Sequence, residues 1–202
     1  MDVLHNILDA ILKAIDGFAT DAPKPTTTDD DDDDDIERRQ FVPTKSLQER
    51  DNTIIDMLNS IGHDDISFCI CDPNLDDCPI IYASDGFCVV TGYNHTEIEG
   101  KNCRFLQGPE TSTYDVNKIR DAIKNQKEAS VNLLNYKKDG TKFNNQFFMC
   151  PLYYSSSASN INDDDKKKSL AYFIGVQCSV KKLGPGQAPS NLGWVYTQGL
   201  HV

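Results

Sequence analysis

The amino-acid sequence predicts an α+β fold, in which one face of an antiparallel sheet carries short helices and encloses a pocket. Two short β-type runs come first, several short helical stretches follow, and three longer β-type runs close the folded part. Antiparallel sheets commonly pack one face on the core, and here that face receives the helices. The 202 residues, 39% hydrophobic and 25% charged, are enough for one sizeable core and some unfolded length.

The chain begins with an amphipathic segment, residues 3–18. Its apolar side chains recur at helical spacing, with polar residues between them. A helix of this length is only marginally stable alone in water. We therefore expect an N-terminal helix that docks on its own domain, on a second copy of the chain in a homodimer, or on a partner protein.

Residues 19–45 form the next segment, which we expect to be a disordered acidic linker. It contains Pro23, Pro25 and an unbroken aspartate run at residues 29–35. Like charges repel one another and bury no apolar surface, so such a run stays solvated. The alternative is an acidic tract that binds another protein.

A second helix is predicted at the start of the folded domain, within residues 46–65. Ser46 and Glu49 have the spacing of a capping box, in which the two side chains satisfy free backbone amides of the first turn. The apolar residues that then share one face are Leu47, Ile54, Leu58 and Ile61, and Gly62 offers a stop.

Two short strands, residues 66–71 and 80–84, are predicted around a turn at residues 72–77. Asp85 is a candidate cap for a short helix through Val90. Glycines limit residues 94–108 to helical turns. Thr113 then caps a longer helix, whose apolar residues are Val116, Ile119, Ala122 and Ile123.

The three longer strands are predicted at residues 129–136, 143–154 and 170–180, and they form an antiparallel meander. Asp139-Gly140 supplies the tight turn between the first two. Residues 155–169 make a long polar loop, which we expect to be a disordered hairpin tip. The tail from residue 183 is rich in glycine and proline, which excludes a regular helix there.

Charge and composition exclude several functions. The net charge of −11 disfavours duplex nucleic acid as a partner, and no apolar stretch reaches the roughly 20 residues of a membrane span. Without a secretory signal, the expected compartment is the cytoplasm or nucleus, where the seven cysteines stay reduced. Cys69 and Cys71, with Cys78 and His63 nearby, do not complete a tetrahedral zinc set, so no metal is expected.

The densest cluster of chemically useful residues is the stretch 102–107. It places the thiol of Cys103 between an amide and a guanidinium. Arg104, joined in space by Arg120, can hold a phosphate through bidentate hydrogen bonds. Five side-chain amides offer donors and acceptors to a neutral heterocycle, namely Asn102, Gln107, Asn135, Asn145 and Gln177.

Residues 66–180 closely resemble a light-oxygen-voltage (LOV) domain, the flavin-binding blue-light sensor of the PAS superfamily found in phototropins and aureochromes. Residues 102–107 are that family's signature hexapeptide, unbroken. The resemblance extends to Asp72-Pro73, residues 79–84, residues 91–93, residues 118–123, Asn135-Tyr136 and residues 172–177. It implies the PAS/LOV fold, with the helix of residues 46–65 flanking a domain at residues 66–182.

The resemblance also implies a cofactor and the residues that bind it. Flavin mononucleotide (FMN) is expected in the pocket, with Cys103 as the photoactive thiol. The other implied contacts are Arg104 and Arg120 to the phosphate, Asn102 and Gln107 to the ribityl chain and ring edge, Asn135 and Asn145 to the pyrimidine edge, Gln177 to N5 and O4, and Cys71 and Phe147 to the flavin. Cys69, Cys71 and Cys78 depart from the family's usual residues, and apart from Cys103 we expect the cysteines mainly to pack.

The implied mechanism is a reversible photochemical switch. Cys103 is expected to be a protonated thiol in the dark, because no cation is evident to stabilise its thiolate. Light would then bond its sulfur to the flavin C4a carbon while N5 gains a proton, and the Gln177 amide would rotate in response. Since the tail cannot form the relay helix of phototropins, the signal is expected to reach residues 47–61 and 3–18 and to change association.

We expect a sensor rather than an enzyme, with any downstream activity carried by another chain. One alternative is a light-independent PAS-type interaction module with a structural flavin, which the intact Cys103 and its amides disfavour. Another is a flavin oxidoreductase, but the chain lacks the glycine fingerprint of a dinucleotide-binding fold.

Overall fold

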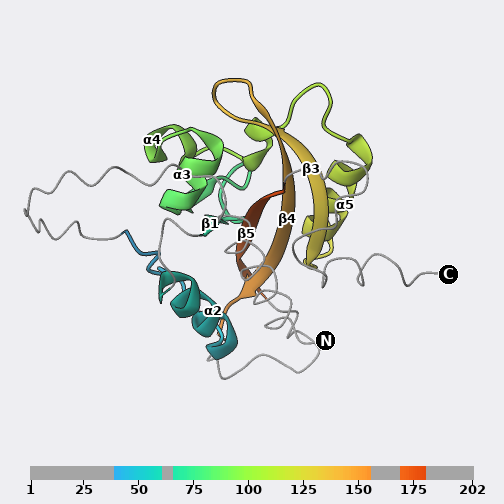
Figure 1. Cartoon of the computed structure of the whole chain (residues 1–202). Helices are drawn as coiled ribbons and strands as arrows, with labels where there is room; N and C mark the ends of the chain where they lie inside the picture. Colours follow the sequence, from blue (N-terminus) through green and yellow to red (C-terminus); the bar gives the residue numbers. More distant parts are fainter. Residues whose placement is uncertain (1–38, 61–65, 156–168, 181–202) are drawn as a thin grey trace, which may run out of the picture.

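The computed structural model describes residues 39–60, 66–155 and 169–180 (Figure 1). The predictions for the amphipathic segment, the acidic run, the hairpin tip and the C-terminal tail therefore lie outside the described residues, as does His63. Within the described part, no helix is long and apolar enough to cross a membrane.

The strands form one five-stranded antiparallel sheet, as predicted. They are β1 (Ser67–Cys71), β2 (Ile80–Ala83), β3 (Ala129–Tyr136), β4 (Lys142–Tyr153) and β5 (Leu170–Val180), in the spatial order β2-β1-β5-β4-β3. The first strand thus pairs with the last, with Ser67 opposite Gln177. This closure brings the two ends of the domain together at the centre of the sheet (Figure 1).

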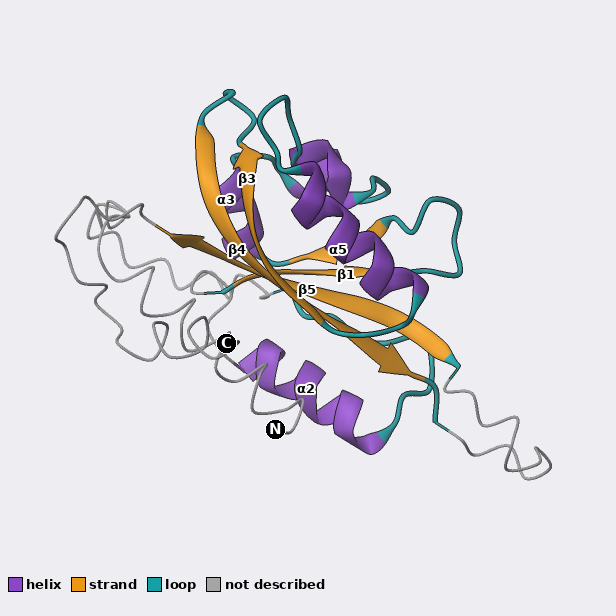
Figure 2. Ribbon diagram, turned by 90° about the vertical axis from the view of Figure 1, so that its right-hand side faces the viewer, coloured by secondary structure: helices purple, strands orange, loops and turns teal. Residues whose placement is uncertain are grey.

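The helices divide between the two faces of the sheet (Figure 2). The helical elements between β2 and β3 are α3 (Asp85–Thr91), α4 (His95–Ile98), the 3₁₀ helix η1 (Cys103–Leu106) and α5 (Thr113–Lys124). Helix α2 (Glu49–Ser60) lies on the opposite side from α3 and α5. Both faces are therefore covered, although the sequence predicted helices on one face only.

Side-chain alternation along each strand separates two apolar clusters. In β1, Phe68 and Ile70 pack with α2, whereas Cys69 and Cys71 belong to the cluster beneath α3 and η1. All five residues of β1 are buried. This explains why the strand is an unbroken apolar run rather than an alternating one.

The predicted capping box of α2 is wrong. The helix starts at Glu49 rather than near Ser46, because Leu47 forms a β-bridge with Tyr154 at the end of β4. The backbone amide of Ser155 also donates to the Ser46 carbonyl, at 2.9 Å. Pairing with a distant strand keeps this segment extended, so a tertiary contact overrides the local helical signal.

Asp51 in the first turn of α2 attaches the helix to the sheet. Its carboxylate is fully buried, accepts a hydrogen bond from the Tyr153 backbone amide at 2.6 Å and pairs with Arg50 at 2.6 Å. A buried charge is tolerated when it is paired and hydrogen-bonded in this way.

Two predicted caps are off by one residue. Ser84, not Asp85, caps α3, and Ser112, not Thr113, caps α5. The Ser84 hydroxyl oxygen accepts from the backbone amides of Phe87 and Phe68 and donates to the Ile66 carbonyl. Ser84 therefore caps the helix and also ties it to β1, which Asp85, inside the helix, does not do.

Candidate functional site

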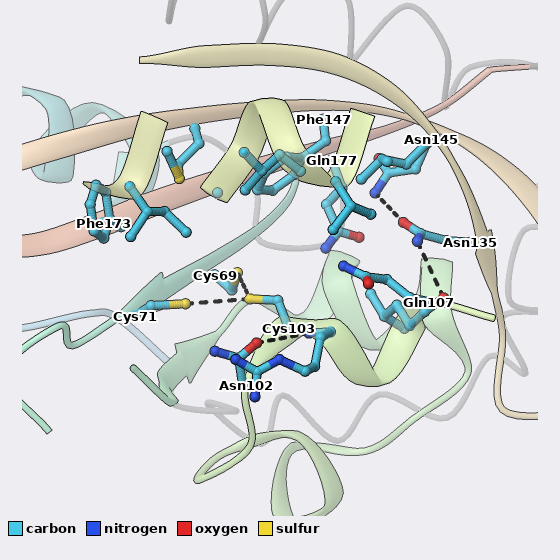
Figure 3. A pocket seen from close by; sticks show the side chains of 18 of the residues that line it. Cys69, Cys71, Asn102, Cys103, Gln107, Asn135, Asn145, Phe147, Phe173 and Gln177 are labelled. Carbon is cyan, nitrogen blue, oxygen red and sulfur yellow. Dashed lines mark hydrogen bonds between the residues drawn. The ribbon is translucent and has the colours of Figure 1, made fainter. Parts of the chain in front are cut away.

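A pocket lies between the inner face of the sheet and the helices η1 and α5 (Figure 3). It contains about 910 Å³ of space free of protein atoms, counted out to its open mouth. All ten residues singled out from the sequence line it, and they are Cys71, Asn102, Cys103, Arg104, Gln107, Arg120, Asn135, Asn145, Phe147 and Gln177. They come from β1, η1, α5, β3, β4 and β5, so the pocket needs the whole fold.

The position of Cys103 is set by Asn102, the N-cap of η1. The Asn102 amide oxygen accepts from the Arg104 backbone amide at 3.0 Å, and its nitrogen donates to the Asp77 carbonyl at 2.6 Å. A weaker bond reaches the Cys78 carbonyl at 3.4 Å. Asn102 thus lines the pocket, but these bonds hold the Cys103 turn in place, whereas the sequence predicted a direct ligand contact.

Three thiols meet at one end of the pocket (Figure 3). The Sγ atom of Cys103 lies 3.4 Å from that of Cys71 and 3.9 Å from that of Cys69. Cys69 and Cys71 are two residues apart on β1, so both side chains leave the same face of the strand. The sequence predicted packing alone for Cys69, yet its sulfur faces the reactive thiol.

These contacts separate the acidities of the three thiols. Hydrogen bonds from Cys69 and then Cys71 hold the pKa of Cys103 well below its usual value, whereas the same contacts raise the pKa of Cys69 and Cys71. Once one sulfur in such a cluster loses its proton, the neighbouring S–H groups stabilise it and keep their own protons. The expected protonated thiol at Cys103 stays a prediction. It rests on the lack of nearby cations, whereas the thiol donors found here lower the pKa of Cys103.

A chain of buried amides lines the opposite part of the pocket. Asn145 donates to the Asn135 side-chain oxygen at 2.9 Å, and Asn135 donates to the Leu106 carbonyl at 3.2 Å (Figure 3). Two buried oxygens, Oδ1 of Asn145 and Oε1 of Gln177, have no hydrogen-bond partner among the described residues. An unpaired buried polar group costs about 1–3 kcal/mol, so both point to a bound ligand with N–H donors.

The two arginines line the pocket, and each has its own partner within the protein. Arg104 forms a bidentate pair with the Asp77 carboxylate, at 2.7 and 2.6 Å, and Arg120 donates to the Asn117 side chain at 3.0 Å. The predicted phosphate contact of the two arginines stays a prediction. The Arg104–Asp77 pair is exposed, and such pairs contribute little stability.

Several apolar lining residues were missed by the sequence reasoning, among them Leu133, Met149, Phe173 and Gly175. Leu133, Met149 and Gly175 lie two residues from a predicted site residue on the same strand, and Phe173 lies four residues from Gln177. All four are therefore on the pocket face by strand alternation. Gly175 has a steric role, because a Cβ atom there would lie 2.8 Å from the Phe147 ring and 3.3 Å from the Cys69 sulfur. Its missing side chain keeps the pocket floor open.

Comparison with known proteins identifies relatives of this domain. The PAS domain family matches residues 65–175. Phototropin-1A of Oryza sativa subsp. japonica is 49% identical over 123 residues, which are 61% of this chain and 12% of that protein. The chain therefore corresponds to a small part of this relative's length.

Solved structures show the same fold. The dark structure of the blue-light photoreceptor Aureochrome1 LOV is 39% identical with a TM-score of 0.52, covering 72% of this chain and 90% of that one. A structure described as "Flavin Analogue Sheds Light on Light-Oxygen-Voltage Domain Mechanism" is 38% identical with a TM-score of 0.55, covering 64% and 86%. The chain thus belongs to the PAS domain family, and its folded part is a LOV domain.

Proposed function

We propose that this protein is a blue-light photoreceptor whose pocket holds a flavin, with Cys103 as the photoactive thiol. One observation carries the proposal: a thiol with a lowered pKa shares a pocket with two buried amide oxygens that lack partners. The similar proteins support it, since one is named a phototropin, one a blue-light photoreceptor, and one structure concerns a flavin analogue.

The residues present fit a flavin. The pyrimidine edge of an isoalloxazine ring alternates carbonyl acceptors with an N–H donor, and the side-chain amides of Asn135, Asn145 and Gln177 offer both kinds of partner. The rest of the tricyclic ring is apolar and suits the surfaces of Leu133, Met149 and Phe173. The unpaired Asn145 oxygen would gain the ring N–H as a partner on binding, and the Gln177 oxygen would gain a donor when N5 takes up a proton.

FMN is the form of flavin that we propose. Arg104 and Arg120 both line the pocket, and a terminal phosphate can replace the Asp77 carboxylate on the exposed Arg104 guanidinium. Denaturing the purified protein and separating the released flavin by chromatography tests this assignment. FMN as the main species is the expected result, and flavin adenine dinucleotide would contradict it.

When bound, the flavin supplies blue-light absorption and a C4a carbon that accepts the Cys103 sulfur while N5 gains a proton. The protein would hold the thiol on η1 and respond to the protonation of N5. The Gln177 amide suits the second task, because its oxygen accepts and its nitrogen donates, so a rotation exchanges the two. That amide is 2% exposed and has no other partner for its oxygen among the described residues.

We propose that the signal passes through the sheet to α2. Gln177 lies on β5 opposite Phe147 of β4 and Ser67 of β1, and the other face of these strands packs against α2. The Asp51–Tyr153 hydrogen bond joins α2 directly to the end of β4. A change in these strands would alter α2 and the N-terminal residues before it, and so change association with a second copy or a partner helix.

The test of the photochemistry is the visible absorption spectrum before and after a blue flash, with Cys103→Ala as the comparison. We expect a structured blue band that bleaches and recovers in the dark in the wild type and does not bleach in the variant. A protein without flavin would contradict the proposal. A bound flavin that never bleaches would instead favour a light-independent interaction module.

Hydrogen exchange tests the signalling route. The amides of residues 49–60 should exchange faster in the lit state of the wild type, and Gln177→Leu should remove that difference while the bleach persists. Equal exchange in dark and light would exclude α2 as the output element.

A further inference from the structure

The proposed photochemistry needs one thiol, yet four cysteines line the pocket, and three of them form a cluster. The sulfur atoms of Cys69, Cys71 and Cys103 lie within 4.8 Å of one another, and the closest pair is Cys71–Cys103 at 3.4 Å. That distance is van der Waals contact between sulfur atoms, so the two sulfurs would have to approach by about 1.4 Å to reach the length of a disulfide bond. The two residues come from β1 and η1, which are separate, rigid elements.

We propose that Cys71 and Cys103 form a redox pair, which a peroxide converts into a disulfide and a dithiol reductant restores. Cys71 is the partner rather than Cys69 because its sulfur is nearer to Cys103, 3.4 Å against 3.9 Å, and because Cys69 is completely buried whereas Cys71 is 7% exposed. Cys103 is only partly buried, so a molecule the size of hydrogen peroxide can reach it.

The chemistry balances with hydrogen peroxide as the oxidant. The Cys103 sulfur attacks one peroxide oxygen, an S–O bond forms, the O–O bond breaks and hydroxide leaves as water after gaining a proton. The Cys71 sulfur then attacks the sulfenic sulfur of Cys103, an S–S bond forms and a second water leaves. Two thiols lose two electrons and two protons, and one peroxide becomes two waters. The low pKa of Cys103 suits it to the first step, because the thiolate is the nucleophile.

The redox pair would also control the light response, a step that rests on the proposed function. A Cys103 sulfur held in a disulfide has no thiol to offer the flavin, so oxidation would switch off the light response while the flavin stays bound. The protein would then report blue light only in a reducing environment.

The experiment treats the purified protein with hydrogen peroxide in the dark, blocks free thiols under denaturing conditions and maps cross-linked peptides by mass spectrometry without reduction. We expect a peptide pair joining β1 to Cys103, 2 Da lighter than the two thiols together. Dithiothreitol should remove it. The flavin bleach, measured on the same samples, should fall in proportion to the cross-linked fraction and return on reduction.

Variants identify the partner, because Cys69 and Cys71 share one peptide. Cys71→Ser should abolish the cross-link, and Cys103 should then be found oxidised to a sulfenic or higher acid. Cys69→Val should form the cross-link as the wild type does. Cys88→Ser is the matched control, since Cys88 lies beside His95 outside the pocket, and it should cross-link at the wild-type rate.

Three results would overturn the redox pair: no cross-link in the wild type, a cross-link that survives in Cys71→Ser, or one that disappears in Cys69→Val. These results do not depend on the photochemistry. A fully reduced protein that fails to bleach would contradict the proposed function instead, and the cross-link would still decide the redox pair.

Discussion

The two faces of the central sheet differ in how they treat polar groups. On the α2 face, apolar residues pack tightly, and the buried carboxylate of Asp51 has both a backbone donor and an arginine. On the pocket face, the buried oxygens of Asn145 and Gln177 have no partner among the described residues. Both faces come from the same strands, since Phe148 of β4 faces α2 and Phe147 lines the pocket.

This difference indicates that the α2 face of the sheet mainly stabilises the fold, whereas the pocket face mainly serves ligand binding. On the α2 face the buried Asp51 is paired, although the Oε1 atom of Gln146, on the same side of β4 as Phe148, also lacks a partner among the described residues. The unpaired oxygens of the pocket face are tolerated because a ligand completes them. Substitutions on the α2 face should therefore change the free energy of unfolding and spare the photochemistry. Substitutions on the pocket face should do the opposite, and the predictions below test this separation.

The largest expected effect is on the pocket face, at Cys103. Cys103→Ala should abolish the light-induced bleach completely, because Cys103 is the one cysteine of η1 and supplies the proposed photoactive thiol. The free energy of unfolding should change by less than about 1 kcal/mol, since the removed atom lines a pocket rather than a filled core. Absorption spectroscopy and urea denaturation measure the two quantities, and a residual bleach would show that Cys69 or Cys71 can replace it.

The next-largest expected effect is the pH dependence of the rate at which individual thiols react with iodoacetamide in the dark. Burial raises the pKa of Cys88 to about 11, whereas thiol donors lower that of Cys103. Only the thiolate reacts, so between pH 7 and 9 the iodoacetamide reaction of Cys88 should accelerate about a hundredfold and that of Cys103 by a clearly smaller factor. Mass spectrometry of timed samples measures both rates. Parallel pH profiles would mean that the thiol cluster does not lower the pKa of Cys103.

On the α2 face, Leu58→Ala should lower the free energy of unfolding by about 2–5 kcal/mol, because Leu58 is 1% exposed and packs against the sheet. The bleach amplitude per bound flavin should stay unchanged. Asp56→Ala, at an exposed position of the same helix, is the control and should stay within about 0.5 kcal/mol of wild type. A loss of bleach in folded Leu58→Ala would show that the two faces are not independent.

Gln177→Leu provides the sharpest comparison, because stability and binding should move in opposite directions. Replacing an unpaired buried amide with an apolar side chain should raise the free energy of unfolding of the flavin-free protein by about 1 kcal/mol. Flavin affinity should fall about five- to tenfold, as one hydrogen bond is lost. Denaturant titration and equilibrium dialysis give the two values. A destabilised flavin-free variant would show that the Gln177 amide serves the fold instead.

The smallest expected effect is on the free energy of unfolding, for a substitution outside both faces of the sheet. Gln126, just after α5, has a left-handed backbone with φ 53°, which glycine adopts without strain. Gln126→Gly should therefore raise the free energy of unfolding by up to about 1 kcal/mol and leave flavin binding unchanged. Gly140→Ala is the reciprocal control. Its φ is 82° and a Cβ atom there would meet no neighbour, so any destabilisation is conformational.

The pocket residues were predictable because the motif of residues 102–107 and strand alternation both act locally. Asn135, Asn145 and Gln177 lie on strands that the sequence predicted, and alternation then places each one on a single face. The N-cap residues of the helices were harder to predict from the sequence. Ser84 and Asp85 are both good caps by composition, and only the contact of the Ser84 hydroxyl with Phe68 and Ile66 distinguishes them.

The sequence by itself determined the α+β class, the five strands, the turn chemistry and ten of the residues that line the pocket. Their causes act over a few residues: alternation, helical spacing and the φ preferences of glycine and proline. The tertiary structure alone decided which distant groups meet. Pairing of β1 with β5 and packing of η1 beneath it set Cys71 against Cys103, 32 residues away, and Asp51 of α2 meets Tyr153, 102 residues away. Such contacts depend on how the whole sheet closes, and no local pattern encodes that.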